Sequence, residues 1–182
     1  KNINNDNQLD EIIKNIRPNI KTIGYGNEKN RYSDILPCSK TMVKLGKTDD
    51  IKNNYINANY INGFNKVKQF IACQGPKQNT IIDFWQMIWE QKVPIIVMLT
   101  DFVENNIKKC EVYFPLNGEI IFGKFKISCE KYINEKYYEI RDLKITYNNE
   151  TRKVKHYKFL NWPDHGVPKQ KKPFLNLIDN CM

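Results

Sequence analysis

The chain has 182 residues, of which 41% are hydrophobic and 12% aromatic, enough for a hydrophobic core and too many for global disorder. No apolar run approaches the roughly 18 residues that a membrane helix needs. The net charge of +9, from 29 Lys and Arg against 20 Asp and Glu, indicates either an acidic partner (nucleic acid, anionic lipid or a phosphorylated substrate) or only a scattered, solvated excess of Lys.

In the first half of the chain, apolar spacing predicts a helix over about residues 7–17, and Pro18 would end it. The stretch from Ile20 to Thr48 is rich in Gly and Pro and is expected to form a loop. Two strands are then predicted, over Tyr55–Ile61 and Gln69–Gln74.

The second half begins with a predicted helix over Thr80–Lys92, which has one apolar face and ends before a buried strand over Pro94–Leu99. A helix followed by an apolar strand favours a mixed sheet with helices packed on it. The next three segments have the pattern of a β-meander, and a last helix starts near Pro173: Glu119–Ser128, Tyr132–Tyr147, Thr151–Trp162 and Pro173–Met182.

The five cysteines are odd in number and lack C-x-x-C spacing, which argues against a disulfide framework and a zinc site. A reducing compartment is therefore expected. These cysteines are Cys38, Cys73, Cys110, Cys129 and Cys181.

The most specific string is W-P-D-H-G-V-P, from Trp162 to Pro168. Two prolines and Gly166 bracket a single carboxylate, Asp164, directly after a predicted strand. One interpretation is a plain turn. The other is a loop that carries an acid over a bound ligand, with Trp162 as its anchor and Gly166 limiting where the backbone bends.

Further motifs precede this string in a fixed order: N-R-Y at Asn30–Tyr32, Y-I-N-A-N at Tyr55–Asn59, Q-G-P, F-W-x-M-x-W, and Lys109-Cys110. With these motifs the chain resembles the classical protein-tyrosine phosphatase domain from about Asn30 to its C-terminus. The resemblance implies an α/β (α+β) fold with a mixed, highly twisted sheet flanked by helices. It also implies that residues 1–182 are a single partial domain, truncated at its C-terminus, with the motifs in residues 30–182.

The resemblance also implies the chemistry. In this family a cysteine thiolate attacks phosphotyrosine, and water hydrolyses the resulting cysteinyl-phosphate. Asp164 matches the general acid and later base, and Tyr32 the ring that lines the phosphotyrosine pocket. Asp34 matches the carboxylate that binds the substrate backbone, and Lys109 a side chain that reaches toward the pocket. Glu104 matches the acidic partner of the phosphate-loop arginine.

Asn30 and Arg31 are expected to organise the loop of Tyr32 rather than to touch substrate. The family's nucleophile loop, His-Cys-x-x-Gly-x-x-Arg, is not found in the chain. No cysteine is preceded by His, and none has Arg six positions later. We therefore expect the chain to be the N-terminal two-thirds of the domain, without the nucleophile and inactive alone.

The sequence favours a fragment of an active tyrosine phosphatase. The alternative is a catalytically inactive, phosphatase-like module that binds or competes for phosphotyrosine proteins. A nucleic-acid binder is disfavoured because the lysines are spread along the chain. The expected partners are phosphotyrosine-containing proteins, without nucleic acid and without a membrane segment in this chain. No metal or organic cofactor is expected, and the expected location is cytoplasmic.

Overall fold

The computed structural model describes residues 20–46, 54–160, 162, 166–168 and 171–181. The helix expected over residues 7–17 lies outside this part of the chain. The described residues fall into two compact units, one ending at Gln74 and one beginning at Gly75. The prediction of one partial domain over the whole chain stays a prediction.

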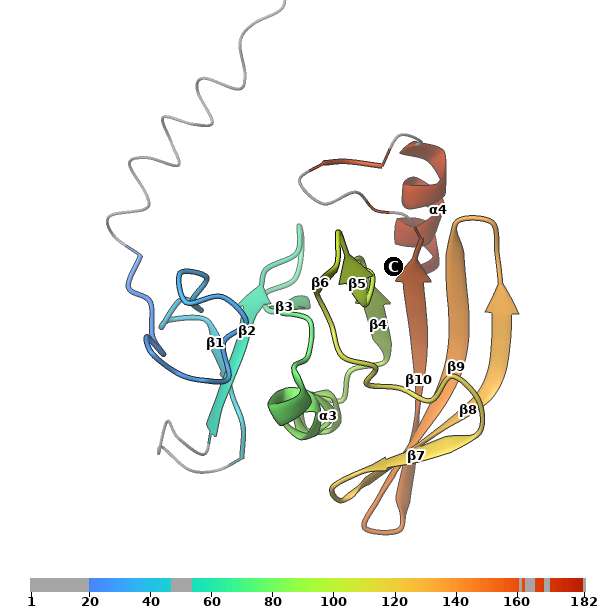
Figure 1. Ribbon diagram of the computed structural model, residues 1–182, viewed down its shortest axis with the longest axis horizontal. Helices are drawn as coiled ribbons and strands as arrows, with labels where there is room; N and C mark the ends of the chain where they lie inside the picture. Colours follow the sequence, from blue (N-terminus) through green and yellow to red (C-terminus); the bar gives the residue numbers. More distant parts are fainter. Residues whose placement is uncertain (1–19, 47–53, 161, 163–165, 169–170, 182) are drawn as a thin grey trace, which may run out of the picture. The chain divides into compact units, whose positions relative to one another are not determined.

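The first unit contains a three-stranded antiparallel sheet in the order β1-β2-β3 (Figure 1). Strand β2 covers Tyr55–Ile61, as the alternating pattern predicts, and β3 covers Phe70–Cys73, inside the second predicted strand. Strand β1, Met42–Lys44, corrects the expectation of loop up to Thr48. The strand forms there because the side chains of Met42 and Val43 are buried and its backbone pairs with β2.

The second unit contains a five-stranded sheet in the order β4-β10-β9-β8-β7. Strand β4 runs parallel to β10 and the other neighbours are antiparallel, which confirms a mixed sheet. The strands of the sheet are β4 (Ile95–Met98), β7 (Glu119–Phe122), β8 (Phe125–Asn134), β9 (Tyr138–Tyr147) and β10 (Glu150–Phe159).

The remaining elements of this unit are short. A 3-10 turn, η2 (Gln78–Thr80), leads into helix α3 (Ile81–Glu90), which lies inside the predicted helix. Strands β5 (Val103–Glu104) and β6 (Ile107–Lys108) form a small hairpin, and helix α4 covers Lys171–Cys181. Among the described residues, no helix combines the length and the apolar character needed to cross a bilayer.

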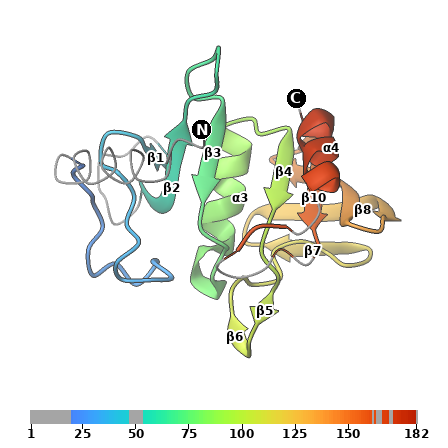
Figure 2. The same ribbon diagram turned by 90° about the horizontal axis from the view of Figure 1, so that it is seen from above.

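The two helices pack on opposite faces of the sheet. Side chains alternate between these faces along β10, so neighbouring residues of this strand contact different helices. Tyr157 and Phe159 form a buried cluster with Leu177 of α4, which lies beside β10 and β4 in Figures 1 and 2. Val154 and His156 point to the other face, where they are buried on the side of α3.

Three sequence predictions need correction in this sheet. The segment Tyr132–Tyr147 is not one strand, because it holds the end of β8 and all of β9, which pair antiparallel and are joined by residues 135–137. The segment Glu119–Ser128 is a hairpin rather than one strand, because Gly123, at φ 58°, opens a two-residue turn between β7 and β8. Strand β4 is buried on one face only: Ile96 and Met98 are buried, while Val97 is 41% exposed. Because the sequence of this strand is apolar at every position, it did not indicate which face would be exposed.

The core on the α3 side holds a buried histidine. His156 is 0% exposed, its ring lies 4.4 Å from that of Phe114, and a 2.7 Å hydrogen bond joins its Nε2 to the hydroxyl of Tyr113. Burial lowers the pKa of His156 to about 3, and the positive charges of Arg141 and Lys158 act in the same direction. The imidazole is therefore neutral at physiological pH.

Candidate active site

The loop that carries Tyr32 is held by the buried side chain of Asn30. The Asn30 amide donates to the backbone oxygen of Gly24 at 2.8 Å. Its Oδ1 accepts from the hydroxyl of Tyr55 and, at 3.1 Å, from the Asn57 amide. Both donors belong to β2. This network supports the expectation that Asn30 organises the loop instead of meeting substrate.

Two further polar side chains fix the same loop. The Asn57 amide also donates to the backbone oxygen of Ile35 at 2.7 Å. Gln74 accepts from the Arg31 backbone N–H at 2.9 Å and donates to the backbone oxygen of Lys29 at 2.7 Å. The sequence predicted only strands and family motifs here and assigned no role to Asn57 or Gln74, so these positioning residues were missed.

Between these fixed points, Tyr32 and Asp34 reach the surface. Tyr32 is 44% exposed and Asp34 is exposed as well. A ring and a carboxylate presented on a rigid loop can contact a ligand with little loss of backbone entropy on binding.

In the second unit, Glu104 forms local hydrogen bonds at the base of the β5–β6 hairpin. Its Oε1 accepts from the Thr100 hydroxyl at 2.7 Å and from the Asp101 backbone N–H at 3.0 Å. Asp101 in turn forms a 2.7 Å ion pair with Lys158 of β10. Glu104 thus holds the hairpin base, which is joined to the main sheet by this ion pair.

Lys109 follows the hairpin, and its backbone N–H donates to the backbone oxygen of Phe102 at 2.9 Å. Gly75 passes directly beside it: a Cβ on this residue would lie 2.7 Å from the Lys109 backbone oxygen. The Glu111 N–H also donates to the oxygen of Pro76 at 2.8 Å. Glycine is required at position 75 because two backbone segments approach closely there.

The W-P-D-H-G-V-P segment is anchored at its two described ends. The indole N–H of Trp162 donates to the backbone oxygen of Gly166 at 3.1 Å. The Trp162 ring packs edge-on against Phe159 of β10 and Phe174 of α4, with ring centres 5.7 and 5.2 Å away. Asp164, between these ends, lies outside the described residues.

The structure thus brings Trp162 and Gly166 into direct contact and places Tyr32 and Asp34 on one loop. Glu104 and Lys109 lie in the same hairpin region of the second unit. The roles assigned to all six in substrate binding or support, and the acid role of Asp164, stay predictions.

The cysteines differ in their thiol chemistry, and none forms a disulfide in the described chain. Burial raises the pKa of the Cys129 and Cys181 thiols, which disfavours the thiolate that a nucleophile needs. The backbone N–H of Lys40 lowers the pKa of Cys38. No arginine stands six positions after Cys38 to complete a phosphate loop.

Residues 26–182 match the sequence model of the protein-tyrosine phosphatase family. The chain belongs to this family. It is 48% identical over 154 residues to human tyrosine-protein phosphatase non-receptor type 12, a match of 83% of the chain and 20% of that protein. It is 40% identical over 168 residues to tyrosine-protein phosphatase 1 of Dictyostelium discoideum, a match of 85% of the chain and 32% of that protein.

Solved phosphatase structures share the fold. The catalytic domain of human protein tyrosine phosphatase non-receptor type 18 superposes with a TM-score of 0.88 at 29% identity, over 97% of this chain and 66% of that one. The same phosphatase in complex with HER2-pY1248 phosphopeptides gives a TM-score of 0.86 at 30% identity, over 96% and 68%. The chain therefore spans about two-thirds of a solved catalytic domain and a smaller share of the curated relatives.

Proposed function

We propose that the protein containing this chain is a protein-tyrosine phosphatase that hydrolyses phosphotyrosine in proteins through a cysteinyl-phosphate. The observation that carries this proposal is the loop of Tyr32 and Asp34, which the buried amide of Asn30 and the side chain of Gln74 hold in place with both side chains exposed. Family membership supplies the reaction type.

In the proposed reaction a cysteine thiolate attacks phosphorus and the bond from phosphorus to the tyrosine oxygen breaks. The departing phenolate, whose pKa is about 10, takes a proton from Asp164. Water then attacks the cysteinyl-phosphate while Asp164 accepts its proton, and inorganic phosphate leaves with the thiolate regenerated. Trp162 and Gly166 support the loop of Asp164. Substrate is bound by Tyr32, Asp34 and Lys109. Glu104 is the acidic partner of the phosphate-loop arginine.

The nucleophile of this reaction is not among the five cysteines of the chain, so residues 1–182 alone are proposed to be inactive. The test compares this chain with the product of the extended reading frame, using a phosphotyrosine peptide and detection of released phosphate. We expect activity only in the longer protein. A stop codon directly after Met182 would refute the proposal.

The acid role is tested in the longer protein by Asp164→Asn, which keeps the shape of the side chain but cannot donate the proton. We expect kcat to fall on the order of 100-fold or more, with substrate binding retained. His165→Gln, at the neighbouring position, is the matched control and should retain most activity. An unchanged kcat in Asp164→Asn would remove this residue from its role.

A second candidate is a non-catalytic module that binds phosphotyrosine proteins, favoured by the absence of Cys-x5-Arg from the sequence. Calorimetry with a phosphotyrosine peptide, and with its unphosphorylated form as control, separates the two. We expect weak or no binding by this chain, because the phosphate loop is missing. A submicromolar Kd would favour the binding module.

The proposed cytoplasmic location rests on the reduced thiol that the reaction requires.

A further inference from the structure

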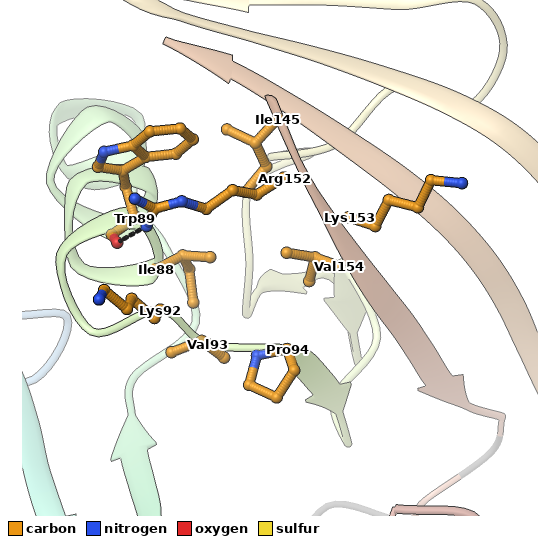
Figure 3. Close-up of a pocket in the computed structure, with 9 residues that line it drawn as sticks. All are labelled: Ile88, Trp89, Lys92, Val93, Pro94, Ile145, Arg152, Lys153 and Val154. Atoms are coloured by element: carbon orange, nitrogen blue, oxygen red, sulfur yellow. Dashed lines mark hydrogen bonds between the residues drawn. The ribbon is translucent and has the colours of Figure 1, made fainter. Parts of the chain in front are cut away.

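A cavity of about 300 Å³ lies in the second unit, between the last turn of α3, the start of β4, and strands β9 and β10 (Figure 3). None of its lining residues belongs to the catalytic or substrate-binding set proposed above. An apolar surface is formed by Ile88, Val93, Ile145 and Val154. A cavity of about 150 Å³ is known to hold benzene, so this volume suits a body of about two fused rings.

The polar part of the cavity is wholly basic. Its lining includes Lys92, Arg152 and Lys153, and none of the lining residues is acidic. Lys153 is 83% exposed and extends away from the other side chains (Figure 3), so Lys92 and Arg152 remain as the cations of the site. An apolar surface with two cations at one end matches a ligand with an apolar body and one negative group.

Arg152 is held in place before any ligand arrives. Its guanidinium carbon lies 3.8 Å from the centre of the Trp89 ring, and its Nη1 donates to the Trp89 backbone oxygen at 2.7 Å. Glu150 approaches its Nη2 at 3.5 Å but is 70% exposed, which makes it a weak competitor. A fixed guanidinium offers a planar set of donors that fits a carboxylate, with little side-chain entropy left to lose.

The backbone of Lys92 is fixed by the helix end, and its side chain is exposed. The Lys92 N–H donates to Trp89 and the Val93 N–H donates to Ile88, the two bonds of a Schellman motif with Lys92 at φ 51°. These bonds, with that of Arg152, occupy the carbonyl oxygens of Ile88 and Trp89, whose negative partial charge would otherwise repel an anion. The helix end therefore places Lys92 beside the cavity, with the carbonyl oxygens of Ile88 and Trp89 already bonded.

We propose that this cavity binds a small amphipathic carboxylate of about the size of a naphthoate. The apolar body packs between Ile88, Val93 and the two strands, and the carboxylate meets Arg152 and Lys92. A ligand of this size is expected to bind with a Kd on the order of 1 mM or tighter.

The test is a titration of the ¹⁵N-labelled chain with 2-naphthoate, followed by NMR at the Trp89 indole N–H and the Arg152 Nε–H. The neutral isostere 2-naphthamide should bind about tenfold more weakly, because it cannot form the charged hydrogen bonds. Lys92→Gly, which keeps the left-handed turn, and Arg152→Gln should each weaken binding of the carboxylate about fivefold and leave that of the amide unchanged.

Lys153→Gln is the matched control, since this lysine points away, and it should bind 2-naphthoate like the parent chain. Thermal unfolding checks that each variant is folded; if Arg152→Gln is not, Lys92→Gly decides alone. Equal affinity for acid and amide, shifts that map elsewhere, or equal losses in Lys92→Gly and Lys153→Gln would overturn the proposal. Failure of the longer protein to bind would also overturn it, because the rest of the domain would then fill the cavity.

Discussion

Lowering the pH from 7 to 5 should destabilise the fold through His156. In the folded protein the pKa of His156 is lowered from 6.5 to about 3, so below pH 6.5 the unfolded chain takes up a proton that the folded chain refuses. Stability from this group is complete above pH 6.5 and is lost as the pH falls toward 3. Each pH unit in this window costs about 1.4 kcal/mol, which gives about 2 kcal/mol at pH 5.

The assay is urea unfolding followed by tryptophan fluorescence, at pH 7 and pH 5, for the parent chain and for His156→Gln. Glutamine can accept the Tyr113 hydrogen bond but does not titrate. The carboxylates contribute equally to both proteins, so the difference between the two losses isolates the imidazole. His165→Gln, which removes the other histidine, is the control. If His156→Gln loses as much stability as the parent between the two pH values, the reasoning is refuted.

Two substitutions test the polar and steric constraints around the candidate site, with the free energy of unfolding as the readout. Gly75→Ala should cost about 2 kcal/mol, because its Cβ would meet the Lys109 oxygen; Gly118→Asn, where a Cβ meets nothing within 4 Å, should cost far less. Asn30→Ala should cost about 2 kcal/mol, because the buried Tyr55 hydroxyl loses its acceptor and the Asn57 amide keeps only the oxygen of Ile35. The exposed Asn117→Ala should stay within about 0.5 kcal/mol. If a variant and its control lost the same free energy of unfolding, the claim that this pair tests would be contradicted.

The local elements were predictable because their patterns are local. The alternation along Tyr55–Ile61 matches β2, and the apolar stripe of Ile81, Trp85 and Ile88 is the buried face of α3. The hairpin at Gly123 was missed because a single Gly in a strand pattern also indicates a bulge. Interpreting Gly123 as part of a turn would have predicted the hairpin.

The support of the candidate site could not be predicted in the same way. Asn57 and Asn30 are 27 positions apart, and Gln74 and Arg31 are 43 apart. A polar residue in a strand pattern is predicted to face solvent. The pattern does not distinguish a side chain that is hydrated from one that forms a hydrogen bond with a residue distant in sequence. The role predicted for Asp164 came from its motif and from the resemblance, and that of Tyr32 from the resemblance. Neither came from periodicity, which carries no information on chemistry.

The position of β4 has a consequence for how the chain behaves in solution. Among the described strands β4 ends its sheet, with β10 on one side and no partner on the other, and Val97 is partly exposed. An open strand edge is a template for pairing between copies. Mutual repulsion from the net charge of +9 opposes such pairing, but only over a Debye length of about 10 Å at 0.1 M salt and about 3 Å at 1 M. The colloidal stability of this chain therefore depends on its lysines, and it should decrease as salt is added.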